Sequence, residues 1–525
     1  MLENILMFWS KSVNNSSIPI LLFLLICATI RLSILRDMSE REGGNIIETF
    51  NNLMNTINQI VWNNGLVVLC LGAGLYFSIR MGFPQIRYFK DMVKLLLHQE
   101  ASSESGISPF QAFATTIGSR VGMGSVAGGA TGIFFGGPGA LFWMWVLGLL
   151  GACTALVESS LAQAYKTKLG GEYIGGPALF IERGMKVKAY AKIFALATIL
   201  GPGILMPGLH ANSVASTFQR AFGVNMVVGG LILSVFLAFV VFGGVKRIGK
   251  FAEKAAPVMC LLYMLMAVGI VFLYYKNIPS VIVTIFKSAF GTDAVFGGIA
   301  GSAIIWGVKR GVYSTEAGQG SGAIVSAAAE TTHPVKQGLV QALSVYIVSF
   351  VVCTSTAVIL LLSNSYNVIG TGGQMLVENL PGSQYGIGWT QDILEASYGG
   401  LIGGKLFAVI IILFVFTSLI GYEYQAESNT SYLFRGNKKA IMVMRAIFII
   451  STFSGVLFNG DVIWTMGDTG AGLMAWLNII AILIMSRKAL KLMNDYKEQR
   501  KSGKDPVFDP ALLDIDDREH IWKRE

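Results

Sequence analysis

The chain has 525 residues, of which 53% are hydrophobic and only 14% are charged, whereas a soluble protein carries about 25% charged residues. This composition excludes an ordinary soluble protein and indicates a multi-pass protein of the cell membrane, with the lipid bilayer as its surroundings. The net charge of +9 could indicate a nucleic-acid partner. Most basic residues, however, lie in short loops between apolar segments, as the positive-inside rule describes, so we expect no nucleic acid.

Apolar stretches follow one another along the chain, and most reach the 17–25 residues that span a bilayer as a helix. The first is interrupted by Arg31 and could be a signal sequence, but it lacks a clear cleavage site, so we expect an uncleaved helix. The stretches run over 17–35, 62–79, 107–135, 139–164, 190–209, 225–245, 256–275, 295–326, 338–362, 405–432, 440–458 and 462–485.

These stretches predict three parts of the chain. Residues 1–60 form an N-terminal extension with an additional transmembrane helix, 61–490 form the core, and 491–525 form a polar tail. We expect the tail, which is polar and charged from Arg487 onward, to have little fold of its own.

The distribution of Lys and Arg predicts the orientation of the core. Loops on one side carry 18 of these residues, against four on the other, so we assign the first side and the C-terminus to the cytoplasm. The 18 are Arg80, Arg87, Lys90, Lys94, Lys166, Lys168, Arg183, Lys186, Lys188, Lys192, Lys246, Arg247, Lys250, Lys254, Lys336, Arg435, Lys438 and Lys439, and the four are Arg220, Lys276, Lys287 and Lys405.

Two glycine-rich tracts, 117–132 and 310–321, interrupt apolar segments. Glycine weakens a helix interior, and bare backbone in a bilayer is tolerated only where it lines a cavity or is buried in protein. Paired interruptions of this kind are the best sequence indication of a transporter binding site. Close helix packing through small residues is the alternative explanation.

The ten segments from residue 107 onward divide into five in 107–275 and five in 295–485, and each set opens with an interrupted segment. An odd number of segments per half gives the halves opposite orientations. The pattern predicts an inverted repeat with a binding site near the midplane, between the two interrupted segments.

The first interruption, Gly122-Met123-Gly124-Ser125, is predicted to bind a substrate carboxylate. Free amides at the start of a half-helix attract anions, and free carbonyls at the end of the preceding half-helix suit a hard cation such as Na⁺. A zwitterionic amino acid fits such a site without a charged side chain. Arg120 could assist the carboxylate or pair with a nearby acid.

The second interruption contributes Tyr313, Ser314, Thr315 and Glu316. An acidic residue within a membrane segment indicates function by default. Glu316 could therefore bind the substrate amine or a proton, or it could cap amides and pair with Lys309 or Arg310.

Other polar residues within apolar segments have two interpretations each. His210 either lines the pocket or lies at the membrane interface, and Glu158 is interpreted as structural. The adjacent hydroxyls of Thr417 and Ser418 could bind Na⁺ through oxygen, although such side chains also bond their own helix backbone. A further acidic pair, Glu423 and Glu427, is expected to bond Arg435.

Several function classes have no support. The five cysteines lie in apolar segments without metal-ligand spacing, no phosphate-binding loop for ATP is present, and no catalytic constellation indicates an enzyme. We therefore expect neither ATP nor an organic cofactor.

Four motifs resemble the alanine or glycine:cation symporter family over roughly residues 60–490. They are Gly-Gly-Pro-Gly-Ala-Leu-Phe-Trp-Met-Trp at 136–145, Glu-Ser-Ser-Leu-Ala-Gln-Ala-Tyr at 158–165, Arg-Gly-Val-Tyr-Ser-Thr-Glu-Ala-Gly-Gln-Gly-Ser at 310–321 and His-Pro-Val-Lys-Gln-Gly-Leu at 333–339.

The resemblance implies an all-α membrane protein with a LeuT-type bundle of five plus five helices and additional N-terminal helices. It implies sodium-coupled uptake of a small neutral amino acid, with Na⁺ as the co-transported ion. It also implies that the first broken helix holds the carboxylate and that Gly118, Val121, Thr417 and Ser418 form the sodium site.

The chain departs from the family pattern within the pocket. The family usually has Thr-Gly-Asn at positions 123–125, where this chain has Met-Gly-Ser, and Phe-Ser-Asn at 313–315, where this chain has Tyr-Ser-Thr. It usually has Gln near His210. These differences leave the fold secure and the substrate open.

The leading hypothesis is an Na⁺-coupled symporter that imports an alanine- or glycine-like amino acid. The alternatives are proton coupling through His210 or Glu316, and a transporter-like receptor or channel. Concentrative uptake separates a transporter from a receptor or a channel.

Overall fold

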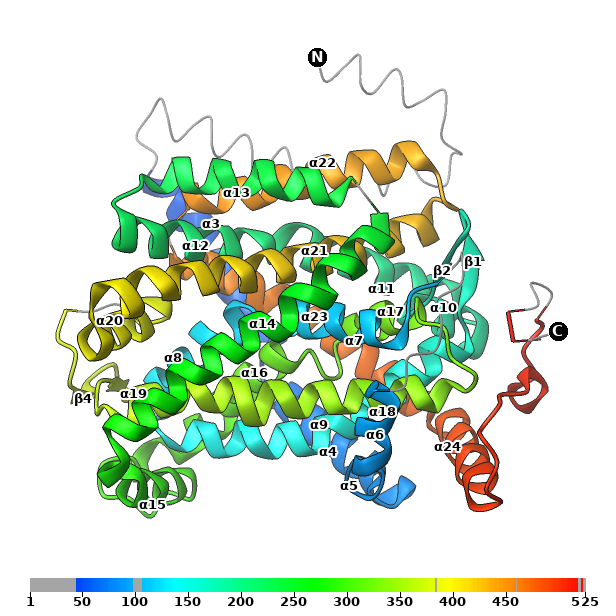
Figure 1. Ribbon diagram of the computed structural model, residues 1–525, viewed down its shortest axis with the longest axis horizontal. Helices are drawn as coiled ribbons and strands as arrows, with labels where there is room; N and C mark the ends of the chain where they lie inside the picture. Colours follow the sequence, from blue (N-terminus) through cyan, green and yellow to red (C-terminus); the bar gives the residue numbers. More distant parts are fainter. Residues whose placement is uncertain are drawn as a thin grey trace.

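The computed structural model describes residues 44–97, 106–242, 244–382, 385–458, 460–517 and 521–522. Most of the long helices run in roughly the same direction, along the horizontal axis of Figure 1. The helix expected in 17–35 lies outside the described residues.

Among the described residues, eight helical segments are long and apolar enough to cross a membrane, which confirms the membrane class. They are Glu48–Met81, Gly139–Ala164, Lys188–Phe222, Ile248–Leu273, Pro334–Leu362, Ile387–Leu433, Lys438–Leu457 and Gly460–Ile484. The described strands form two short antiparallel hairpins, β1 (Thr167–Leu169) with β2 (Glu172–Ile174) and β3 (Asn367–Ile369) with β4 (Met375–Glu378). The all-α prediction is therefore confirmed.

The helices of the first predicted half follow the expected order. They are α7 (Pro109–Arg120), α8 (Met123–Gly136), α9 (Gly139–Ala164), α11 (Lys188–Leu200), α12 (Pro207–Phe222), α13 (Met226–Val241) and α14 (Gly244–Leu273). Between the two halves lies α15 (Ile278–Ala289).

The helices of the second predicted half come after α15. They are α16 (Ala300–Thr315), α17 (Ser321–Ala327), α18 (Pro334–Tyr346), α19 (Thr354–Leu362), α20 (Ile387–Gly399), α21 (Phe407–Leu433), α22 (Lys438–Ser454) and α23 (Gly460–Ile484). The pairs α7–α8 and α16–α17 are the two interrupted helices that the glycine tracts predict. A symmetry relation between the halves stays a prediction.

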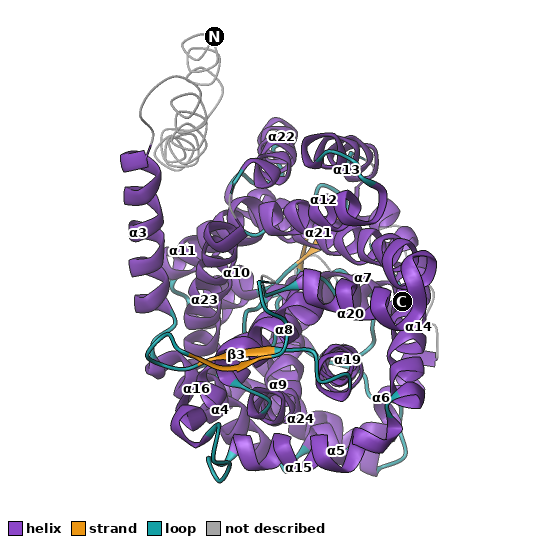
Figure 2. Cartoon of the chain, turned by 90° about the vertical axis from the view of Figure 1, so that its left-hand side faces the viewer, coloured by secondary structure: helices purple, strands orange, loops and turns teal. Residues whose placement is uncertain are grey.

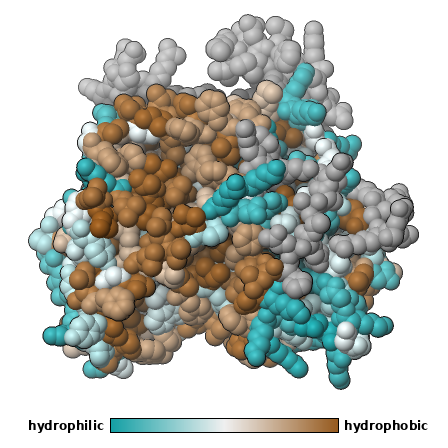
Figure 3. Space-filling model, viewed as in Figure 1, coloured by the Kyte–Doolittle hydropathy of each residue, from teal (hydrophilic) through white to brown (hydrophobic). Residues whose placement is uncertain are grey.

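Apolar side chains cover the surface that a bilayer would surround. Hydrophobic residues occupy much of the face in Figure 3, and hydrophilic residues gather at its lower right. On α13 and α14, Phe239 is 71% exposed and Phe272 is 75% exposed. Such exposure is stable only against lipid or another apolar surface.

Both interrupted helices lie inside the bundle. The end-on view shows α8 among surrounding helices (Figure 2), and α8 packs against α9 and α16. A capping box between Ser108 and Gln111, with Pro109 in the first turn, fixes the start of α7. From Ala112 to Ile133 every residue is buried, so these two half-helices form part of the core.

The N-terminal helices α3 (Gly44–Val61) and α4 (Asn64–Met81) are joined by a short turn. Asn58 Nδ2 donates to the carbonyl of Thr465 at 3.2 Å, and Trp62 Nε1 donates to that of Asp468 at 2.8 Å. These bonds attach α3 to α23, so the described part of the predicted extension packs on the core.

The C-terminal tail differs from the sequence prediction, because residues 486–501 form a helix, α24 (Ser486–Lys501), followed by a short turn at Pro510–Leu513. Its face of Leu492, Met493 and Tyr496 is buried. Such a spacing places apolar residues on one side of a helix. The packing of this side stabilises the helix, although the average composition of the tail is polar.

The region before α18 anchors this tail. Phe508 N donates to Thr332 O at 2.9 Å, and His333 Nε2 lies 3.0 Å from Asp495 Oδ2. Burial lowers the pKa of His333 to about 4. The ring is therefore neutral near pH 7 and forms a hydrogen bond with Asp495 rather than an ion pair.

Candidate substrate and sodium site

The first interruption separates α7 from α8 at Val121 and Gly122. Gly122 has an extended backbone with φ −120° and ψ −146°, and the hydroxyl of Ser125 donates to the carbonyl of Arg120 at 2.9 Å. That bond pairs one of the carbonyl groups that lack a partner within the helix at the C-terminal end of α7. Val121 and Gly122 are buried inside the bundle.

The second interruption separates α16 from α17 and contains left-handed backbone at Glu316 (φ 52°), Gly318 (φ 87°) and Gly320 (φ 81°). Glycine adopts this conformation without strain, which explains two of the three residues. Glu316 is held by its side chain. Its Oε2 accepts from Ser119 Oγ at 3.1 Å and from Ser321 Oγ at 2.8 Å, so the carboxylate joins α7 to α17.

The two interruptions touch each other at Gly124. Ser314 Oγ donates to the carbonyl of Gly124 at 2.5 Å, and a Cβ atom at Gly124 would lie 2.6 Å from Cδ1 of Tyr313. Only glycine allows this approach. The structure thus brings together Gly124, Tyr313 and Ser314, as the sequence predicts for a substrate site.

Two hydroxyls of α21 lie against the end of α7. Ser418 Oγ donates to Gly118 O at 2.9 Å and Thr417 Oγ1 does so at 3.3 Å, while both also bond carbonyls of their own helix. A Cβ atom at Gly122 would collide with Ser418 Oγ. Gly118, Thr417 and Ser418 therefore meet in one buried place, and the buried Val121 precedes Gly122 in the chain. The carbonyl and hydroxyl oxygens are of the kind that a hard cation prefers as ligands.

His210 is buried beside the same interruption. Its Nδ1 lies 3.2 Å from Met206 O, and its ring meets that of Tyr422 edge-on at 5.1 Å. Nε2 has no hydrogen-bond partner among the described residues and would lie 3.0 Å from a Cβ atom at Gly122. The imidazole thus borders the first interruption from α12.

Thr315 serves its own helix end. Its hydroxyl donates to Gly311 O at 2.8 Å and accepts from Ala317 N at 3.3 Å. These bonds hold the hydroxyl on the α16 terminus, whereas neighbouring Ser314 reaches the first interruption.

Glu158 supports the second interruption from α9. Its Oε2 accepts from Gly320 N at 3.2 Å and from Asn478 Nδ2 at 2.6 Å, and Asn478 also donates to Gly318 O at 2.9 Å. A carboxylate that accepts a backbone N–H stabilises the turn that contains it. This geometry agrees with the structural interpretation of Glu158.

Arg120 is fully buried and bonds groups on α18 rather than a carboxylate. It donates to Ser344 Oγ and, at 3.3 Å, to Gln341 O. Its guanidinium also lies against Gly322 of α17, where a Cβ atom would collide with it. The bonds are neutral, so the interpretation of Arg120 as one half of an ion pair is not supported by a direct contact.

The basic pair on α16 bonds Asp468 of α23 and not Glu316, which removes one sequence alternative. Lys309 Nζ lies 2.9 Å from Asp468 Oδ2, and Arg310 bonds the same atom. These three residues line a cavity of about 380 Å³ together with Trp306 and Trp464. The cavity lies next to Tyr313, whose ring meets that of Trp464 at 6.0 Å.

Two of these partners, Asp468 and Arg445, were not identified from the sequence. Asp468 could have been identified, because it is an acidic residue within a membrane segment, as Glu316 is. The partner of Glu423 and Glu427 is Arg445, not Arg435, with separations of 3.2 and 2.7 Å. Arg445 lies within the apolar segment 440–458, so a search for basic partners in the loops did not include it.

Two interrupted helices that touch inside a membrane bundle define a secondary transporter of the LeuT-type fold. The sequence model of the sodium:alanine symporter family matches residues 47–510, and the chain belongs to this family. It is thus a transport protein and not an enzyme.

Individual relatives agree with this assignment. The sodium/proton-dependent alanine carrier protein of Bacillus sp. (strain PS3) is 45% identical over 421 residues, which cover 79% of this chain and 93% of that protein. The sodium/alanine symporter AgcS of Methanococcus maripaludis is 35% identical over 462 residues, with 86% and 98% covered.

Among solved structures, the crystal structure of MhsT in complex with L-phenylalanine superposes with a TM-score of 0.54 at 12% identity. The match covers 75% of this chain and 99% of that chain. At this identity the likeness shows the fold alone, and it confirms the LeuT-type prediction.

Proposed function

We propose that the chain imports a small neutral amino acid, alanine or glycine, together with Na⁺ that moves down its gradient. The observation that carries the proposal is the pair of hydroxyls, Thr417 and Ser418, on the carbonyl of Gly118. Membership of the sodium:alanine symporter family and the names of the two relatives support it.

Na⁺ binds to the carbonyl oxygens of Gly118 and Val121 and to the hydroxyls of Thr417 and Ser418. Burial supports this assignment, because a bound cation gains most from oxygen dipoles where water is excluded. These ligands come from α7 and α21, so the ion holds the two helices together. Na⁺ is the co-transported ion rather than a resident cofactor.

The amino acid binds at Gly122, Met123, Gly124 and Ser125, with its carboxylate on backbone amides at the start of α8. Tyr313, Ser314 and Thr315 on α16 and His210 on α12 complete the site. The close contact of Tyr313 with Gly124 supports a small side chain on the substrate.

Proton coupling is the second candidate, with Glu316 or His210 as the proton carrier. One observation favours it: Glu316 Oε1 and His210 Nε2 are buried and have no hydrogen-bond partner among the described residues. The name of the Bacillus relative, which includes both ions, agrees with it. A receptor or a channel is the third candidate.

The orientation of the protein in the membrane is inferred from its basic residues. The protein lies in the cell membrane with its C-terminus in the cytoplasm, as the distribution of Lys and Arg supports.

Uptake into proteoliposomes separates these candidates. Labelled alanine, glycine and larger amino acids are offered with an imposed Na⁺ gradient, an imposed proton gradient, or neither. We expect concentrative alanine uptake with the Na⁺ gradient. Equally fast uptake in Na⁺-free buffer with a proton gradient would contradict Na⁺ coupling, and uptake that only equilibrates would indicate a channel.

A further inference from the structure

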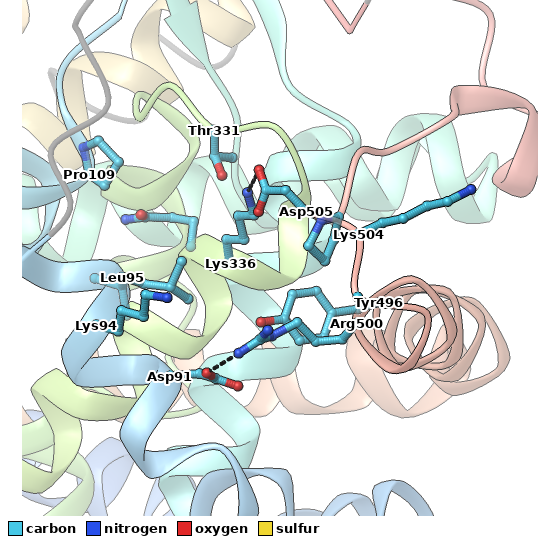
Figure 4. A pocket seen from close by; sticks show the side chains of 14 residues that line it. Asp91, Lys94, Leu95, Pro109, Thr331, Lys336, Tyr496, Arg500, Lys504 and Asp505 are labelled. Atoms are coloured by element: carbon cyan, nitrogen blue, oxygen red, sulfur yellow. Dashed lines mark hydrogen bonds and ion pairs between the residues drawn. The ribbon is translucent and has the colours of Figure 1, made fainter.

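A second cavity lies where the C-terminal tail meets the core. It has a volume of about 410 Å³. Its walls come from α6 (Phe89–Leu97), the first turns of α7 and α18, α24 and the segment 503–506. Figure 4 shows this cavity from close by.

The described lining contains more cationic than acidic side chains. Lys336 and Arg500 are each paired with an acid, since Asp505 lies 2.7 Å from Lys336 and Asp91 bonds Arg500. Lys94 forms no hydrogen bond or ion pair with the described residues, and its side chain extends into the cavity, whereas Lys504 points away (Figure 4). The cavity therefore has a surplus of positive charge that its own acids do not neutralise.

A buried amide makes this cavity more than a patch of surface lysines. Gln337 lines it and is only 1% exposed, yet neither its Oε1 nor its Nε2 has a hydrogen-bond partner among the described residues. Buried polar groups are nearly always paired, because an unpaired one loses its hydration without compensation. An anion in the cavity would accept from the amide nitrogen of Gln337 and from Lys94.

The position of α6 indicates which kind of anion the cavity binds. Phe89, Val93 and Leu97 are exposed along one side of this helix at a spacing of four residues. An apolar stripe flanked by lysines is typical of a helix that lies in the headgroup region of a membrane. In Figure 1, α6 runs across the direction of α18, as an interfacial helix would.

We propose that this cavity binds the phosphate headgroup of an anionic phospholipid, held by Lys94 of α6, Gln337 of α18 and Arg500 of α24. The site lies at the cytoplasmic leaflet if the orientation proposed above holds, and that leaflet is the anionic one. A bound headgroup bridges the tail to the first turn of α18. The same tail bonds Thr332 through Phe508, so lipid binding stabilises the cytoplasmic end of α18.

The test measures thermal unfolding of the full chain in mild detergent as short-chain phosphatidylglycerol, phosphatidylcholine or inorganic phosphate is added. A ligand that binds the native state raises the unfolding midpoint with its concentration. We expect phosphatidylglycerol to act and phosphatidylcholine not to act. A basic side chain near an anionic surface contributes about 1 kcal/mol, so Lys94→Gln should weaken the apparent affinity about fivefold.

The control is Lys90→Gln, an exposed lysine one turn earlier on α6 that does not line the cavity. Its affinity for phosphatidylglycerol should equal that of the unmodified chain. Equal loss in the two variants would overturn the proposal, since it would show attraction to the basic surface as a whole. Equal stabilisation by inorganic phosphate would also overturn it and assign the site to a soluble phosphate. These readouts involve no uptake, so their failure leaves the proposed transport function intact.

Discussion

The two interrupted helices differ in what holds them. The second, between α16 and α17, is braced by carboxylates: Glu316 bonds Ser119 and Ser321, and Glu158 bonds Gly320. At the first, between α7 and α8, the hydroxyls of α21 and the imidazole of His210 approach the break itself, while Glu316 reaches Ser119, three residues before Gly122.

This difference suggests a division of roles. A turn whose amides and hydroxyls are bonded to buried carboxylates has little capacity left for a ligand, whereas neutral dipoles around open backbone can stabilise an ion or a zwitterion. We therefore expect the second interruption to act mainly as the frame and the first to provide the backbone that binds the ligands. Each prediction below changes one of them.

The largest effect is expected from Gly124→Val. The valine side chain would occupy the space beside Tyr313 and block the carboxylate site, so alanine binding should be lost. Binding of labelled alanine to purified protein measures this, and Gly124→Ala should also weaken binding, because its Cβ atom already lies 2.6 Å from Cδ1 of Tyr313.

Gly72→Val is the matched control for that substitution, because a Cβ atom at Gly72 meets nothing within 4 Å. It should bind alanine normally. Unchanged alanine affinity in folded Gly124→Val protein would contradict the placement of the substrate.

A change in the frame should act on stability. Glu158→Ala leaves the amide of Gly320 and the side chain of Asn478 without their buried acceptor, which costs about 1–3 kcal/mol for each unpaired group. The thermal unfolding midpoint should fall, while the Na⁺ concentration for half-maximal uptake should stay unchanged in protein that remains folded. A shift in Na⁺ dependence at constant stability would make Glu158 part of the ligand site.

Substitutions of the α21 hydroxyls should change the Na⁺ dependence of uptake rather than the stability of the protein. Thr417→Ala and Ser418→Ala each remove one proposed Na⁺ ligand, a bond to a charged group worth about 1.5–3 kcal/mol, and should raise the half-saturating Na⁺ concentration about tenfold or more. Uptake against Na⁺ concentration measures this. Thr430→Ala is the control, since that hydroxyl on the same helix bonds Ala426 O. An identical Na⁺ dependence in all three variants would refute the sodium site.

The sequence predicted this contrast only in part. Glycine tracts indicate where a helix breaks because they weaken it locally, and the hydroxyl pair stands out by its chemistry. The braces are contacts between residues distant in sequence, such as Glu158 with Asn478, which lie 320 positions apart. No local pattern encodes such a pairing. The tail was mispredicted because the four buried residues of α24 stabilise the helix despite its polar average composition.

The smallest effect concerns His210, the titratable group that borders the ligand site and faces Tyr422 and Gly122. Protonation would place a positive charge beside Ser418, where Na⁺ is proposed to bind, and like charges repel strongly when buried. An unperturbed imidazole titrates near pH 6.5, whereas an amide does not titrate. Because the ring of His210 is fully buried, its protonated form is disfavoured and forms only at lower pH. Lowering the pH from about 7.5 to about 4.5 should therefore raise the half-saturating Na⁺ concentration, and His210→Gln should remove this rise and shift preference toward alanine or glycine. Na⁺ titrations of uptake at both pH values check the expectation. Parallel pH profiles and the same substrate ranking in the two proteins would show that His210 does not act on the site, and would leave Glu316 as the proton carrier to examine.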